Sequence, residues 1–249
     1  MKSLSTKEKI ISFVWQHFLL IISLFIMTFG VALCVRSALG SSVISTIPFV
    51  MSLAGQAELA PALTIGEYTY IMNFVLVLGQ ILVLRRKFEL VQLLQLVIGF
   101  LFGFLLDVNM ALVSVFPYDT FLECMGAQII GCTVLAFGIA AEIRCGSVTM
   151  PGEGMPVAIT RVTKLTFPVA KIIIDITLVV IAVLCGYYYF GCWKWDVVGP
   201  GTLFAMIYVG AAVKFINPRM TWFERILDYT PRFRRYLYGL ARFVSYRRQ

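Results

Sequence analysis

Charged residues are scarce in this 249-residue chain, and their scarcity limits the class of protein it can be. Asp, Glu, Lys and Arg make up 14% of the residues and apolar residues make up 60%, whereas soluble domains are roughly a quarter charged. So few polar groups cannot cover the surface of a water-soluble fold. The composition therefore predicts a protein that lies in a lipid bilayer, and no apolar stretch alternates in the way that would indicate a barrel.

The chain also lacks the groupings of residues that catalysis and metal binding need. His17 is its one histidine, and its six cysteines show no paired or ligand-type spacing. No Ser/His pairing, no carboxylate pair with a metal ligand and no phosphate-cradling motif is present. The sequence thus predicts a protein that is not an enzyme and has no cofactor or metal, and whose cysteines are small core residues.

Six apolar stretches are long enough to cross a bilayer, which takes about 20 residues of helix. They are His17–Val35, Ile65–Leu84, Leu90–Leu106, Leu122–Ile143, Phe167–Phe190 and Val198–Ile216. The predicted fold class is an all-α polytopic membrane protein with six transmembrane helices. The third helix is expected to end at the charged residue Asp107.

A weak internal repeat divides the chain into two halves. A shift of 108 positions places Phe29, Gly30, Ala32, Arg36 and Pro48 on Phe137, Gly138, Ala140, Arg144 and Pro156. After each long stretch comes a Gly/Ser/Pro-rich segment, Gly40–Ala54 or Gly146–Thr163, that is predicted to be re-entrant and to dip into the protein. Three spans per half is an odd number, so the halves are predicted to be inverted relative to each other, with a cavity between them.

The distribution of basic residues predicts the domains and their orientation. Residues 1–16 form a cytoplasmic segment, 17–116 the first repeat, 117–218 the second, inverted repeat, and 219–249 a basic C-terminal tail. If basic residues stay inside, both termini are cytoplasmic, as is the Arg85–Lys87 cluster. The expected localisation is the bacterial cytoplasmic membrane.

Polar residues in the dipping segments and in the helix ends before them are the candidate solute-binding residues. They are Arg36, Ser41, Ser42, Ser45, Glu142, Arg144, Ser147, Thr149 and Glu153. A guanidinium can hold an oxyanion through two parallel hydrogen bonds, so Arg36 and Arg144 are predicted to bind an anionic solute. Short helices that begin after Gly40 and Gly154 would favour an anion as well. Glu142 and Glu153 either pair with an arginine or carry a coupling proton.

Several of these residues also have a purely structural interpretation. Arg36 and Arg144 stand at span ends, where long basic side chains reach lipid headgroups. Glu153 lies between two glycines and fits a solvated loop. Lys171 and Asp175 are one helical turn apart and can pair with each other.

The C-terminal tail combines arginines with large apolar residues. Thr221-Trp222-Phe223-Glu224 reads as a capping box that opens a short helix, and Thr230-Pro231 begins a second one. An apolar stripe flanked by arginines is typical of a helix that lies on anionic lipid headgroups. Nucleic acid is therefore not an expected partner, and the oligomeric state, including a homo-oligomer, is left open.

Some of the repeat residues carry a family resemblance. The Phe-Gly pair before a dipping segment, Ala38-Leu39-Gly40 followed by Pro48, and the later span GTLFAMIYVGAAVKF are similar to the YczE/YitT type of bacterial integral membrane protein. The resemblance reaches to about Pro218 and implies a multi-span protein of the cytoplasmic membrane, without naming a substrate.

The leading functional hypothesis is a transporter or channel for a small polar, anionic solute. Two alternatives remain open at this point. One is a non-transporting membrane scaffold or regulatory protein that recruits a partner through its basic tail. The other is the substrate-binding subunit of a larger transport complex.

Overall fold

The structure is a computed structural model that describes residues 6–115, 120–145 and 150–227. Within these ranges the chain is helical and contains no strand, which confirms the predicted all-α fold. The long helices are α1 (Thr6–Arg36), α3 (Ile65–Leu84), α4 (Leu94–Val113), α5 (Phe121–Cys145), α7 (Phe167–Phe190) and α8 (Pro200–Ile216). All six are long and apolar enough to cross a membrane. The six predicted spans are confirmed, and the protein is a multi-pass membrane protein.

Shorter elements connect the long helices. They are η1 (Val43–Ser45), α2 (Thr46–Gln56), η2 (Arg85–Lys87), η3 (Leu90–Leu93), α6 (Pro151–Val162), η4 (Asn217–Arg219) and α9 (Thr221–Leu227). The helix predicted to open at Thr221 is thus present as α9. The one predicted from Thr230 lies outside the described residues.

Three predicted boundaries are wrong. α1 begins at Thr6, well before His17. α4 runs past Asp107 to Val113. The charge of Asp107 does not end the helix, because its carboxylate accepts hydrogen bonds from Gly66 N (2.8 Å) and Thr64 Oγ1 (2.6 Å) at the start of α3. α6 begins at Pro151 and not after Gly154, since proline lacks the N–H that a first helical position leaves unpaired.

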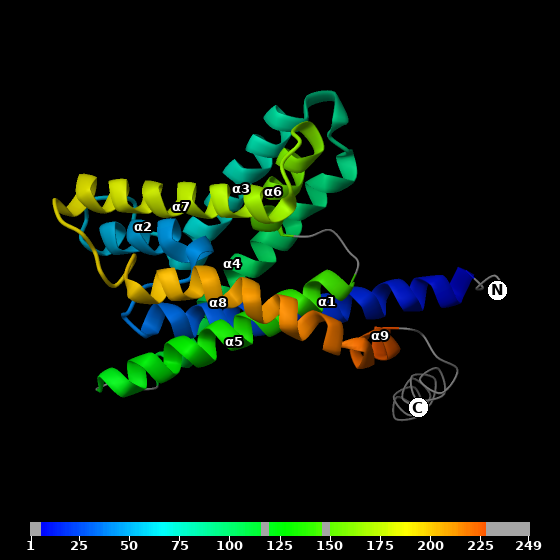
Figure 1. Ribbon diagram of the computed structural model, residues 1–249, viewed down its shortest axis with the longest axis horizontal. Coiled ribbons are helices and arrows are strands. Elements are labelled where there is room, and N and C mark those ends of the chain that lie inside the picture. The colour runs from blue at the N-terminus through cyan, green and yellow to red at the C-terminus, as the bar shows by residue number, and fades with distance from the viewer. Residues whose placement is uncertain (1–5, 116–119, 146–149, 228–249) are drawn as a thin grey trace, which may run out of the picture.

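The helices form two bundles, which Figure 1 shows one above the other, with α4 running from the upper bundle down to the lower one. In the long-helix bundle, α1 packs against α4 and α5, and α5 packs against α8. In the half-helix bundle, α2 and α6 each pack against both α3 and α7. The bundles meet chiefly where α3 packs against α4, whereas α7 makes no comparable contact with α8.

Antiparallel helices α1 and α5 form the centre of the long-helix bundle. They approach so closely that a Cβ atom on Gly30 would lie 2.5 Å from Leu135 N, and one on Gly138 would lie 2.7 Å from Met27 N. Under the shift of 108 positions, Gly30 corresponds to Gly138 and Met27 to Leu135. Each contact is therefore the counterpart of the other with the two halves exchanged.

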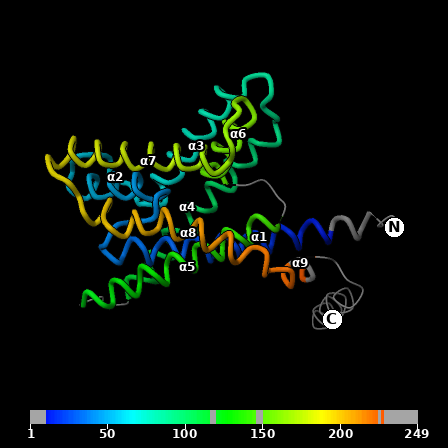
Figure 2. Tube along the Cα trace, in the orientation of Figure 1, coloured from blue at the N-terminus to red at the C-terminus, as the bar shows by residue number. Residues whose placement is uncertain are grey.

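Helices α2 and α6 start in the interior and run toward opposite ends of α7, as the tube in Figure 2 shows. Val50 of α2 packs near Gly186 in the C-terminal part of α7, while α6 contacts the N-terminal part through Lys171. Their beginnings meet, since the Ile44 side chain lies 2.4 Å from the position of a Cβ on Gly152. These two residues also correspond under the same shift. The inverted relation of the whole halves stays a prediction.

Side chains on the outer surface of the helices match a lipid environment. Leu82, Leu184 and Ile207 are exposed on the helix flanks, as side chains in contact with lipid are. Trp193 and Trp195 follow the end of α7 with their rings in a tilted contact, centroids 5.7 Å apart, and such tryptophans are typical of a membrane interface.

Candidate functional site

The three serines before α2 are buried, and their hydroxyl groups are bonded within the protein. Ser41 Oγ donates to Val197 O (3.1 Å), Ser45 Oγ donates to Ser42 O (2.9 Å), and the hydroxyls of Ser42 and Ser45 lie 2.8 Å apart. These bonds fix the turn that starts α2. In this conformation the serines act as structural groups.

The segment that leads to these serines lies along the start of α8. Gly201 N donates to Leu39 O (2.8 Å) and Ser41 N donates to Val197 O (3.0 Å). Gly40 has a φ of 118°, in the region that glycine alone adopts freely, and a Cβ there would lie 2.7 Å from Gly199 N. The beginning of the first half-helix is thus joined to the long-helix bundle.

The structure does not bring together the two arginines that were predicted to form an anion site. Arg36 is exposed in the last turn of α1. Arg144 donates from Nε to Asn217 Oδ1 (2.9 Å) and from Nη2 to Asn217 O. Ser37 contacts Gln128 at one end of the α1–α5 pair, and Ser23 contacts Cys145 at the other end. Arg36 and Arg144 therefore lie at opposite ends of this pair, about 20 Å apart at a rise of 1.5 Å per residue.

Glu142 is the most deeply buried of the predicted ionisable residues, with 3% of its surface exposed. Its Oε1 accepts a hydrogen bond from Met150 N (2.9 Å), the residue just before α6. Its Oε2 has no hydrogen-bond partner among the described residues. An unpaired buried carboxylate oxygen is costly, and an acidic residue buried in a membrane helix is a candidate for a functional role.

Glu153 belongs to a charged cluster between α6 and α7 and not to a solvated loop. Lys171 Nζ lies 2.9 Å from Asp175 Oδ1 and 3.4 Å from Glu153 Oε1. The predicted Lys171–Asp175 pair is therefore confirmed, whereas nothing in the sequence indicated that Glu153 would join it. The cluster fixes the start of the second half-helix to α7.

Buried amides between α3 and α4 are the polar groups that the sequence analysis missed. Gln80 Nε2 donates to Gln95 Oε1 (2.9 Å) and to Pro151 O (3.3 Å), and Gly154 lies against both glutamines. Asn73 is 1% exposed, and neither its Oδ1 nor its Nδ2 has a partner in the part of the chain that is described. Amide side chains at helical spacing inside apolar spans were the sequence signal that could have pointed to these residues.

Two predicted site residues, Ser147 and Thr149, lie outside the described residues. Among the residues that are described, no group of three His, Cys, Asp or Glu side chains could hold a metal ion. The carboxylates of Glu142, Glu153 and Asp175 therefore do not form a metal centre there.

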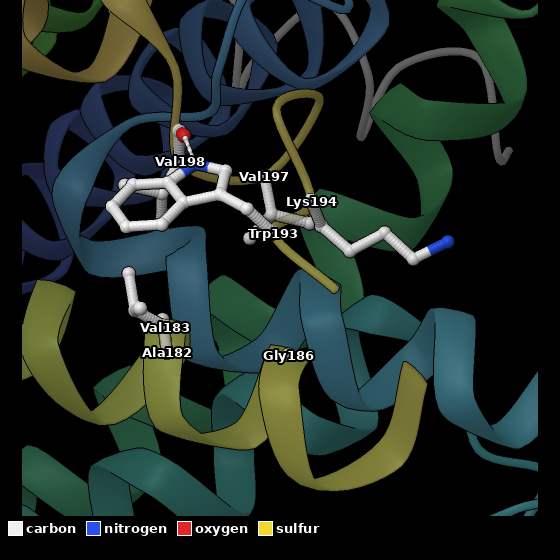
Figure 3. A pocket seen from close by; sticks show the side chains of 7 residues that line it. All are labelled: Ala182, Val183, Gly186, Trp193, Lys194, Val197 and Val198. Atoms are coloured by element: carbon white, nitrogen blue, oxygen red, sulfur yellow. Dashed lines mark hydrogen bonds between the residues drawn. The ribbon is translucent and has the colours of Figure 1, made fainter. Parts of the chain in front are cut away.

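One hollow lies where the chain leaves α7, and Figure 3 shows its lining. The Trp193 ring faces Ala182 and Val183 of α7, and its Nε1 donates to Val198 O (2.8 Å). The enclosed space, about 10 Å³, holds one water molecule at most. This hollow is a packing gap at the helix end and is too small for a solute.

Comparison with known proteins places the chain in a family. A family of unknown function, DUF6198, matches residues 14–218, which takes in most of α1, the other five membrane helices and both half-helices. The chain belongs to the DUF6198 family. No curated protein and no solved structure matches this DUF6198 chain, and the resemblance to the YczE/YitT type stays a prediction.

Proposed function

We propose that this DUF6198 protein is a membrane carrier for a small polar solute, which binds between the two bundles at the interface of α3 and α4. The observation that carries the proposal is the buried Asn73, whose amide has no partner among the described residues and which faces Gly99 across this interface. An unpaired buried amide costs free energy that a polar ligand would return. Gln80 and Gln95 extend the same polar strip.

A carrier must open this interface, and the arrangement of the bundles favours such a motion. Each bundle contains corresponding elements of both repeats, yet α3 packs on α4 while α7 does not pack on α8. If the halves are inverted repeats, exchanging their roles moves the half-helix bundle away from α4 and toward α8. Rocking of one bundle against another around a central site is how many carriers of this type work.

The described part of the structure does not favour an anionic solute. The predicted preference for an anion depended on Arg36 and Arg144, and Arg144 holds Asn217 at the end of α8. The ionisable groups near the start of α6 are mainly carboxylates. Neutral amides line the α3–α4 interface itself, so a solute that offers both hydrogen-bond donors and acceptors fits it best.

Uptake into liposomes tests the proposal. Purified protein is reconstituted and supplied with a panel of labelled amino acids, sugars, carboxylates and amines. We expect saturable uptake of at least one class, and loss of that uptake in Asn73→Leu, which keeps the branched shape of the side chain and replaces its polar atoms with methyl groups. Binding without uptake would favour a subunit of a larger complex. Neither binding nor uptake would favour a scaffold or regulatory protein.

A further inference from the structure

Glu142 lies at the joint between the two bundles. Its helix, α5, belongs to the long-helix bundle, and its Oε1 accepts the hydrogen bond of Met150 N at the start of α6 in the half-helix bundle. Any movement of α6 relative to α5 must therefore change the surroundings of this carboxyl group. No other carboxyl group of the described residues is both so deeply buried and bonded across this joint.

No cation neutralises Glu142 within the described part of the chain. The titratable groups of the elements around it are engaged elsewhere or exposed. Arg144 and Arg219 bond to backbone or side-chain oxygens, His17 contacts Phe13 O, Lys171 pairs with Glu153 and Asp175, and Lys214 is exposed. Glu153 of α6 and the thiol of Cys145 interact with Glu142 electrostatically, and neither of them is a countercharge.

The second carboxylate oxygen of Glu142 is the observation that points to a ligand. Oε2 has no partner among the described residues, although a carboxylate can accept several hydrogen bonds. A proton is the one ligand that needs no more space than this buried oxygen offers. It would also remove the negative charge that a buried carboxylate otherwise keeps in an apolar interior.

We infer that Glu142 takes up a proton from water on one side of the membrane and releases it on the other, so that a proton gradient drives the carrier. This inference rests on the proposed carrier function. The step adds one proton to the carboxylate and later returns it to water, and no other bond is made or broken. When Glu142 is neutral, its repulsion of Glu153 is removed and α6 can stay close to α5. When it is ionised, the repulsion favours separation of the two helices.

Infrared difference spectroscopy of the full-length protein in lipid nanodiscs tests proton binding without a solute. Between mildly acidic and mildly alkaline buffer, we expect a protonated-carboxyl band that titrates and that is lost in Glu142→Gln. Glu123→Gln is the matched control, because Glu123 lies exposed on the same helix and accepts a bond from Thr120 N through Oε2 (3.0 Å), which glutamine can also accept. Glu142→Asp keeps the titrating group and should move the band. A band that persists in Glu142→Gln, or no titrating band at all, overturns the inference.

Transport measurements separate this inference from the proposed function. With a solute identified, Glu142→Gln should keep exchange of labelled for unlabelled solute and lose accumulation driven by an imposed pH gradient, by tenfold or more. Wild-type uptake that ignores the pH gradient overturns the inference and leaves the carrier function standing. Absence of uptake for every solute tested, together with a titrating Glu142 band, counts against the carrier function and against the proton-driven transport that rests on it, and leaves only proton binding at Glu142 standing.

Discussion

Two glycines allow the backbones of the central helices α1 and α5 to come into direct contact. Gly30 and Gly138 each lie against the backbone of the opposite helix, and small residues of this kind are how membrane helices gain van der Waals contact when the hydrophobic effect cannot drive them together. The Cβ positions are below 3 Å from backbone atoms. Backbone cannot rotate away as a side chain can, so any substitution must push α1 and α5 apart.

Gly138→Ala is expected to lower the free energy of unfolding by about 1–3 kcal/mol, the usual cost of overpacking a tight interface. The measurement is thermal unfolding in detergent micelles, followed by tryptophan fluorescence. Gly126→Ala is the control, since Gly126 lies on the same helix with nothing within 4 Å of its Cβ position and alanine is the better helix former. Equal melting temperatures for the two variants would contradict the close approach.

At the scale of elements, Arg144 ties the end of α5 to the end of α8. Two of its hydrogen bonds go to the side chain and the backbone carbonyl of Asn217, which is the C-cap of α8. Lysine keeps the charge and has no planar fork. Arg144→Lys should therefore destabilise the protein by about 1–3 kcal/mol, whereas Arg36→Lys, at an exposed helix end, should leave the melting temperature unchanged. A reversed ranking of the two variants would show that Arg36 has a role that this structure does not reveal.

How far the sequence predicted these elements depends on the range of the interactions involved. Long apolar runs predicted the six spans, because twenty consecutive apolar residues leave the chain few alternatives. The Lys171–Asp175 pair was predictable because it lies within one turn. The Asp107 cap of α3 and the Glu153–Lys171 contact join different elements, and nothing local distinguishes these carboxylates from residues that end a helix or lie in a loop.

The candidate site was harder to predict than the fold for the same reason. The sequence analysis gave weight to charge and selected the arginines, although a charge at a span end can be satisfied nearby, as Arg144 is by Asn217. Asn73, Gln80 and Gln95 carry no charge, and their importance comes from burial at one interface. Glu142 was selected because it lies near the end of an apolar helix, and the structure shows that it is buried and bonds to Met150 at the joint of the bundles.

For the whole molecule, the orientation in the membrane can be measured directly. The basic turn Arg85–Lys87 lies near the C-terminal end of α6, where Arg161 and Glu89 form an ion pair (3.9 Å), and Asp196 lies in the connection after α7. In a variant without its six cysteines, Lys87→Cys is expected to react with an impermeant thiol reagent only from the cytoplasmic side, and Asp196→Cys only from outside. Both positions are exposed. Labelling of both from the same side would rule out the orientation that the basic residues predict.

If the protein is the carrier proposed above, the arrangement of the bundles predicts which contacts must break during transport. The contact between α3 and α4 joins the two bundles, whereas that between α1 and α5 lies within one of them. If the half-helix bundle rocks from α4 toward α8, a bond between α3 and α4 holds the protein in one state, and a bond between α1 and α5 has no such effect. A covalent link between α3 and α4 should therefore block transport, whereas a link between α1 and α5 should not.

Cysteine pairs at these two places test the motion. Tyr70 and Phe100 touch on the outer flank of α3 and α4, with ring centroids 5.4 Å apart, so cysteines there can be joined by a short thiol-specific cross-linker without disturbing buried residues. We expect this cross-link to abolish solute exchange and uptake, and reduction of a cleavable linker to restore them. The control variant keeps only Cys34 and Cys132, whose sulfur atoms lie 3.7 Å apart between α1 and α5. Oxidation of these two cysteines to a disulfide should leave the transport rate within about twofold of that of the reduced protein, a change below 1 kcal/mol. Full transport with α3 joined to α4 would exclude the rocking motion, because the one large contact between the bundles would then never have to open.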